Sequence, residues 1–233
     1  MSESRSAPAA RPSSDLPGGR RRRNPRGKGN RLRAEILRAA AAILEETGDE
    51  SAVTLRAIAR EVGIAAPSIY AHFPDREAVL DQLVADGFAE FTVTLQTAVS
   101  AFADPVDRLY AGCRAYLNYA AERPERYRIL FHHPGVKLRE RQIDPAARAQ
   151  GAAALDVLVQ AIAACAAADR SATDDPFADA VAVWVALHGL ATLLAETPDD
   201  FPWPARDQML TVLVGRLAQL TPAPQDPIPG PPL

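Results

Sequence analysis

Residues 54–77 read Thr54-Leu-Arg-Ala-Ile-Ala-Arg-Glu-Val-Gly-Ile-Ala-Ala-Pro-Ser-Ile-Tyr-Ala-His-Phe-Pro-Asp-Arg-Glu77, and this pattern predicts two short helices joined by a tight turn. Thr54 can cap the first helix, because its hydroxyl can accept from a free backbone N–H of the first turn. Gly63 can end it, since a left-handed backbone costs a glycine nothing. Between them, apolar residues recur at three- and four-residue spacing: Leu55, Ile58, Ala59 and Val62. We therefore expect a helix-turn-helix.

The second helix is predicted to span Ala66 to Phe73. Pro67 suits its first turn, where a missing N–H is tolerated. Pro74 ends it, because a proline disfavours the helical conformation in the residue before it. A helix of this length is short enough to be a recognition element rather than a core helix.

The sides of this second helix differ in chemistry. Ile69 and Phe73 are expected to face inward, whereas Ser68, Tyr70 and His72 are not needed for a core. Small and hydrogen-bonding side chains on an outward face suit insertion into the major groove of DNA, which is about 12 Å wide. An ordinary pair of surface helices is the alternative that this pattern alone leaves open.

The composition is that of a soluble globular chain. The 233 residues predict one or two domains, and 48% of them are hydrophobic and 24% charged. The sequence contains no uninterrupted apolar run of membrane-spanning length and no charged-then-apolar leader, so we expect neither export nor a membrane partner. The two cysteines, Cys113 and Cys165, make no disulfide framework. A cytoplasmic location fits this cysteine usage.

The charge is distributed unevenly along the chain. Residues 1–33 contain ten Arg or Lys and only two acidic residues, whereas the whole chain carries a net charge of −3. A basic end ahead of an acidic body indicates a polyanionic partner at that end. We expect residues 1–30 to be a disordered arm and residues 221–233 a disordered proline-rich tail. The arm could follow DNA phosphates or remain a solvated tail, and the sequence leaves both open.

Helical periodicity and proline spacing predict an all-α fold. Residues 31–77 are expected to form a three-helix DNA-binding domain, and residues 78–220 a helical bundle for ligand binding and dimerisation. Further helices are expected at 31–47, 75–102, 105–122, 124–131, 145–168, 176–196 and 204–220. The last two are apolar on nearly every side, which indicates burial on more than one side. A symmetric four-helix interface between two copies would provide that burial.

The run Ile69-Tyr-Ala-His-Phe-Pro-Asp-Arg-Glu-Ala-Val-Leu80 resembles the signature of the TetR family of transcriptional regulators. The resemblance covers residues 31–80, in the family's order and spacing. It implies a dimeric DNA-binding regulator that pairs through its last two helices. One departure is Ala65-Ala66, where the family usually has Ser or Thr, so a side-chain cap is missing. Trp184, His188 and Gly189 further resemble the C-terminal type named for Trp-His-Gly.

The resemblance also implies which residues contact operator DNA. Pro67, Ser68 and Tyr70 are expected to make base-edge or apolar groove contacts, since they lie on the recognition helix. Phosphates are expected to be held mainly by Thr54, His72 and Arg76. Arg56 and Ala66 complete the predicted DNA-binding set. For Arg76, an ordinary surface charge remains the alternative.

A ligand cavity is predicted among the helices of residues 80–195, because helical bundles hold ligands between their helices. Its expected lining consists of aromatic residues and one histidine: Phe88, Phe91, Tyr116, Tyr127, Phe131, Trp184 and His188. Each of these side chains could instead simply fill the core. For His188 in particular, a hydrogen-bonded core histidine competes with a role in ligand binding.

No pattern in the sequence supports catalysis or metal binding. It contains no glycine-rich phosphate loop, nucleophile elbow or zinc-ligand spacing, so we expect no enzyme, cofactor or metal. The predicted function is a repressor that binds a palindromic operator as a dimer and is released by a small molecule. The alternative is a helical ligand- or partner-binding module that does not bind specific DNA.

Overall fold

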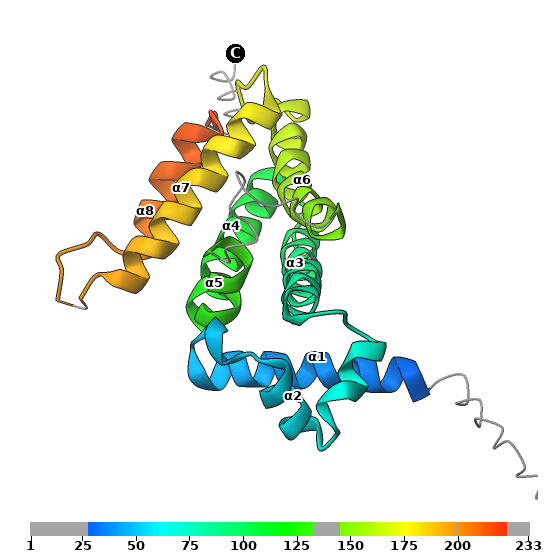
Figure 1. Ribbon diagram of the computed structural model, residues 1–233. Coiled ribbons are helices and arrows are strands. Elements are labelled where there is room, and N and C mark those ends of the chain that lie inside the picture. Colours follow the sequence, from blue (N-terminus) through cyan, green and yellow to red (C-terminus); the bar gives the residue numbers. More distant parts are fainter. Residues whose placement is uncertain (1–27, 133–144, 199, 223–233) are drawn as a thin grey trace, which may run out of the picture.

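The computed structural model describes residues 28–132, 145–198 and 200–222, and within these ranges the secondary structure is helical (Figure 1). The predicted all-α fold class is confirmed. The expected basic arm and proline-rich tail fall almost wholly outside the described residues. The helices follow in this order: α1 (Lys28–Thr47), η1 (Glu50–Ala52), α2 (Leu55–Val62), η2 (Ala66–Ala71), α3 (Arg76–Ser100), α4 (Pro105–Glu122), α5 (Pro124–His132), α6 (Pro145–Ala167), α7 (Pro176–Glu196) and α8 (Arg206–Leu217).

The N-terminal unit consists of α1, which lies across one end of the molecule, with α2 and η2 beneath it (Figure 1). Its small core takes apolar side chains from each helix. Ile36 of α1, Ile58 of α2 and Ile69 of η2 are fully buried, and Phe73 is nearly so. The η2 helix is therefore held by its inner face alone, and its outer face is left to solvent.

Local signals in the sequence produce the turns of this unit. The Thr54 hydroxyl accepts from the Ala57 backbone N–H at 3.1 Å and caps α2. Gly63 has a φ of 75°, the left-handed conformation predicted for it. The Asp75 carboxylate accepts from the Ala78 N–H at 2.7 Å and caps α3. The predicted roles of Thr54 and Gly63 are confirmed.

The remaining helices form the bundle. Helix α3 runs from the N-terminal unit into it and packs along α6 on one side, while α7 and α8 lie together on the other (Figure 1). Helices α4 and α5 lie between these two layers. The core takes apolar side chains from α3 to α8, among them Phe91, Leu109, Leu130, Ile162, Leu187 and Leu210.

The second helix of the turn differs from the expected one. It is a six-residue 3-10 helix, in which the Ser68 N–H donates to the Ala65 carbonyl at 2.8 Å. Ala65 offers no side-chain cap to stabilise the start of an α-helix. The chain therefore takes the tighter helix, which suits short pieces.

Helix α8 ends earlier than the sequence suggests, at Leu217 instead of residue 220. Gln219 has a φ of 49°, and the Leu220 backbone pairs with Ser171 in an isolated antiparallel bridge. The Thr221 N–H also donates to the Arg170 carbonyl at 3.0 Å. Backbone pairing with a distant segment thus replaces the last helical turn, and local periodicity could not have indicated this.

By length and composition, α6 and α7 are both apolar enough to cross a membrane, over Arg148–Ala167 and Pro176–Glu196. Core helices of soluble proteins pass the same test. Here α6 packs against α3, α4 and α7, and α7 packs against α4 and α8 as well. Only 22% of the window in α6 and 28% of the window in α7 are nevertheless buried, so these neighbours cover a minor share of each helix.

Candidate DNA-binding surface and ligand cavity

The outward face of η2 is formed by Pro67, Ser68 and Tyr70, all exposed. Tyr70 is 60% exposed, although tyrosine is a large side chain that usually buries its ring. Ile69 and Phe73 beside it are buried and anchor the helix. The face therefore presents a ring, a hydroxyl and a proline to a partner, without using any of them in the core.

Four other predicted DNA-binding residues surround this face. Arg56 is exposed on α2, and Ala66 and His72 at the two ends of η2 are half-buried. Thr54 is exposed, but its hydroxyl oxygen already accepts from the backbone of α2. Its hydroxyl proton is left to donate, so capping and a phosphate contact are compatible.

Arg76 lies in a different setting from the other predicted contacts. Its Nε donates to the Val53 carbonyl at 2.8 Å, and one terminal nitrogen donates to the Glu50 carbonyl at 2.6 Å. The same guanidinium lies 3.3 Å from the Glu50 carboxylate and 3.6 Å from that of Glu77. Arg76 thus fastens the η1 loop to the start of α3. A phosphate contact by Arg76 remains a prediction and would have to be shared with these bonds.

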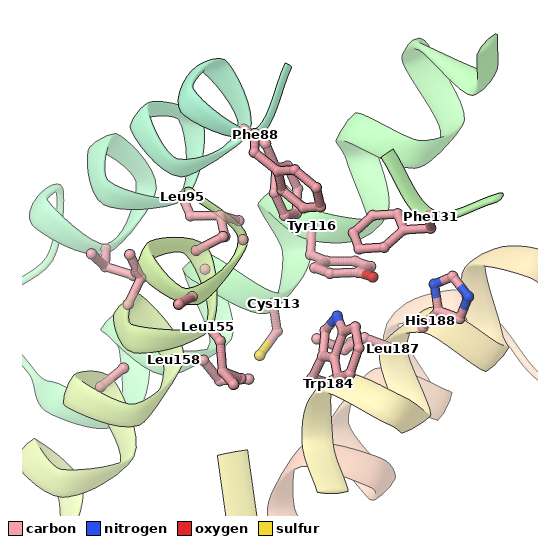
Figure 2. A pocket seen from close by; sticks show the side chains of 18 of the residues that line it. Phe88, Leu95, Cys113, Tyr116, Phe131, Leu155, Leu158, Trp184, Leu187 and His188 are labelled. Carbon is pink, nitrogen blue, oxygen red and sulfur yellow. The ribbon is translucent and has the colours of Figure 1, made fainter. Parts of the chain in front are cut away.

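A cavity of about 640 Å³ lies in the bundle between α3, α4, α6 and α7 (Figure 2). Six of the seven predicted lining residues form part of its wall: Phe88, Phe91, Tyr116, Phe131, Trp184 and His188. The wall is largely apolar, and its aromatic side chains come from α3, α4, α5 and α7. The volume lies within the range of about 300–1,000 Å³ that is usual for small-molecule sites.

The seventh predicted residue, Tyr127, lies behind the wall and supports it. Its hydroxyl lies 3.0 Å from the Tyr116 hydroxyl and 2.7 Å from Nδ1 of His188. Burial raises the pKa of Tyr127 to about 12, and burial with the contact to Tyr127 raises the pKa of Tyr116 as well. Both tyrosines are therefore neutral at physiological pH, and they fix the ring of His188.

The aliphatic part of the wall and the charged residue Arg148 were not predicted from the sequence. Leu95, Leu155 and Leu158 face the cavity from α3 and α6, and Cys113 faces it from α4 (Figure 2). Burial raises the pKa of the Cys113 thiol to about 12, so it acts as a small apolar group. Arg148, exposed near the start of α6, also borders the cavity. Arg148 lies three residues before Gly151 and seven before Leu155, and this helical spacing could have indicated that it borders the cavity.

Helix α5 touches both the cavity wall and the N-terminal unit. Phe131 faces the cavity, while Arg126 on the same helix pairs with Glu45 of α1 and, at 2.6 Å, with Glu90 of α3. The Arg128 guanidinium donates to the Gly48 carbonyl at the end of α1. A displacement of α5 would therefore also act on α1, the helix that packs against α2.

Among the described residues, no three His, Cys, Asp or Glu side chains gather in an arrangement that could hold a metal ion. Cys113 and Cys165 are both buried and free. The chemistry concentrated in this part of the chain is that of binding surfaces.

Two family descriptions match the chain. "Bacterial regulatory proteins, tetR family" matches residues 36–83, and "Tetracyclin repressor-like, C-terminal domain" matches residues 109–217. The chain belongs to the TetR family. This confirms the predicted class of function, a ligand-responsive DNA-binding transcriptional regulator. The Trp-His-Gly subtype of the C-terminal part remains a prediction.

Two solved structures share this fold, and one further protein is similar in sequence. A protein of unknown function from Rhodococcus sp. RHA1 superposes with a TM-score of 0.68 at 28% identity, over 80% of this chain and 93% of that one. AibR, solved in complex with isovaleryl coenzyme A and operator DNA, gives 0.58 at 19% identity, over 81% and 99%. The nucleoid occlusion factor SlmA of Vibrio campbellii is 28% identical over 112 residues. That alignment spans 48% of this chain and only 57% of SlmA.

Proposed function

We propose that this TetR-family protein is a transcriptional repressor that binds a palindromic operator as a dimer and is released by a small molecule. The observation that carries the proposal is the outer face of η2. Tyr70, Ser68 and Pro67 stand exposed on a helix whose inner side is fixed by buried Ile69. In the cell, the protein would be cytoplasmic and associated with the nucleoid while bound to DNA.

The chemistry of this face suits groove contacts. A serine hydroxyl can bond to several base edges, and apolar side chains can contact thymine methyl groups. Thr54, Arg56 and His72 lie around the face, where they could hold phosphates and fix the helix in register. The side chains of η2 would then supply sequence preference, and those around it would supply position.

A dimer would place two such faces on one DNA duplex. Two recognition helices must lie about 34–36 Å apart to enter successive major grooves on one side of the duplex. Helices α7 and α8 support such pairing, because Phe177, Val185, Leu193 and Val212 on them are exposed apolar side chains. A second copy packed through the same two helices would cover these side chains symmetrically.

Release by a ligand would act through the helices that touch both the cavity and the N-terminal unit. Helix α3 begins at that unit and contributes Phe88 and Phe91 to the cavity wall. Helix α5 contributes Phe131 and pairs with α1 through Arg126. A ligand that binds more tightly to an arrangement with the wrong spacing of the η2 helices would shift the population towards it.

The test is binding to the intergenic DNA upstream of the gene at physiological salt, measured by mobility shift against a scrambled duplex of equal length. We expect Tyr70→Ala to weaken operator binding by about 1–3 kcal/mol while the protein stays dimeric. Phe102→Ala is the matched control, because Phe102 is 50% exposed beyond the far end of α3. It should leave DNA binding unchanged.

Equal binding of Tyr70→Ala and the wild type would remove η2 as the recognition helix. Equal binding of the wild type to the operator and scrambled duplexes would favour the alternative function, a helical ligand- or partner-binding module without specific DNA binding. Salt titration separates the contributions further. Phosphate contacts weaken as the salt concentration rises, whereas the ratio of the affinities for the two duplexes reports base contacts.

A further inference from the structure

The charge among the described residues that line the cavity is positive only. Among the described residues that line it, Arg148 is the only charged one, and none is acidic. Arg148 is exposed, which places its guanidinium at the edge of the cavity and not in its interior. From the described lining, a cation entering the cavity would meet a like charge and no carboxylate, whereas an anion would meet a partner.

The interior offers little to a second polar group. The Tyr116 hydroxyl is already bonded to Tyr127, and Tyr127 to His188. The rest of the wall is built mainly of Phe, Leu, Val and Ala side chains, together with the neutral Cys113 thiol. Besides Tyr116, only Trp184 and His188 among the described lining residues carry polar ring atoms inside the cavity, so a charged group there would lose most of its hydration and a charge fits better at the edge.

We propose that the effector of this cavity is an anionic amphiphile, with an apolar body that fills the cavity and one carboxylate or phosphate beside Arg148. This inference rests on the proposed ligand response of the same cavity and names the chemical class of its ligand. The apolar body supplies most of the affinity, since burial of apolar area is the main driving force available there. The anion supplies the selection against neutral and cationic molecules of the same length.

Isothermal titration with ten-carbon probes below their micelle concentrations tests this. Decanoate and decyl phosphate carry the two candidate anions, decanol is neutral, and decylamine is cationic. We expect both anions to bind, decanol to bind about fivefold more weakly, and decylamine more weakly still. Raising the salt concentration should narrow the gap between decanoate and decanol, because the pair with Arg148 is exposed.

Variants at position 148 make the test specific. Arg148→Gln should weaken decanoate binding about fivefold and leave decanol unchanged. Arg148→Glu should invert the order of decanoate and decylamine. Arg108→Gln is the matched control, since Arg108 is exposed on α4, does not line the cavity and carries the same charge. Circular dichroism checks that each variant folds.

Decylamine binding as tightly as decanoate would overturn the proposal, as would Arg148→Gln with unchanged decanoate affinity. Failure of every probe to bind would also reject this ligand class. Operator binding by the same preparation, without probe, distinguishes these outcomes from failure of the proposed function, because none of the residues of the DNA-binding face lines the cavity. If decanoate binds and also releases the operator duplex, both proposals are supported together.

Discussion

The helix-turn-helix and the bundle present opposite kinds of surface. On the helix-turn-helix, the exposed aromatic Tyr70 stands beside buried Ile69 and Phe73, at the N-terminal end of a core that continues into the bundle. On α7 and α8, exposed apolar side chains such as Val185 and Leu193 continue the core of a much larger bundle outward. An isolated exposed ring among polar neighbours suits a reversible contact with DNA. A run of exposed aliphatic side chains suits lasting association with another apolar surface.

This contrast teaches that exposure must be judged together with what surrounds it. Val93 on α3 is exposed to the same extent as Tyr70, at 60%, yet it stands apart from the apolar faces of α7 and α8. Scattered apolar side chains of this kind are ordinary on protein surfaces. The comparison can therefore be tested by making the same substitution at two equally exposed residues that lie in different surroundings.

The largest effect is expected for Val185→Asp on α7. If α7 and α8 form the dimer interface, the symmetry of the dimer buries two unpaired carboxylates there, and dissociation should become easier by about 3–5 kcal/mol. Sedimentation velocity over a concentration series would detect the monomer. Val93→Asp, equally drastic and equally exposed, should leave the dimer intact. A dimer that survives Val185→Asp at micromolar concentration would contradict the proposed interface.

A second test compares two glycines, one from each region. An added Cβ would meet no atom within 4 Å at Gly63 or at Gly189, but only Gly63 has a positive φ, of 75°. Gly63→Ala should lower the free energy of unfolding by about 1–2 kcal/mol, because alanine is strained in the left-handed region. Gly189→Ala in α7 should raise it by about 0.5–1 kcal/mol. Urea unfolding measures both, and equal effects would contradict the backbone explanation.

The turn at Gly63 is one of the features that could be predicted from the sequence. Thr54, Gly63 and Asp75 act on neighbours within a few residues, so the turns of the helix-turn-helix could be predicted from local pattern. The 3-10 form of η2 was missed, although the missing cap at Ala65 had been noticed. The helix class of a six-residue segment depends on small energy differences that residue pattern does not resolve.

The cavity could be predicted only in part, because its walls come from helices far apart in the sequence. Aromatic side chains identified six members of the wall, but Tyr127 proved to stand one layer behind, and Arg148 was missed. Periodicity indicates which face of a helix is buried. It does not indicate whether that face meets another side chain or an open space, since this is decided by long-range packing.

The smallest effect concerns that second layer. Tyr127→Phe removes a hydroxyl placed between the buried Tyr116 hydroxyl and Nδ1 of the half-buried His188, and so deletes two hydrogen bonds. We expect a loss of about 1 kcal/mol in the free energy of unfolding, measured in urea. Tyr119→Phe is the matched control, because the buried Tyr119 hydroxyl has no hydrogen-bond partner among the described residues. Its removal should be neutral or slightly stabilising, since it relieves an unsatisfied group. If the two substitutions cost the same, the hydroxyl of Tyr127 does not hold His188 in the cavity wall, and packing of the rings alone does so.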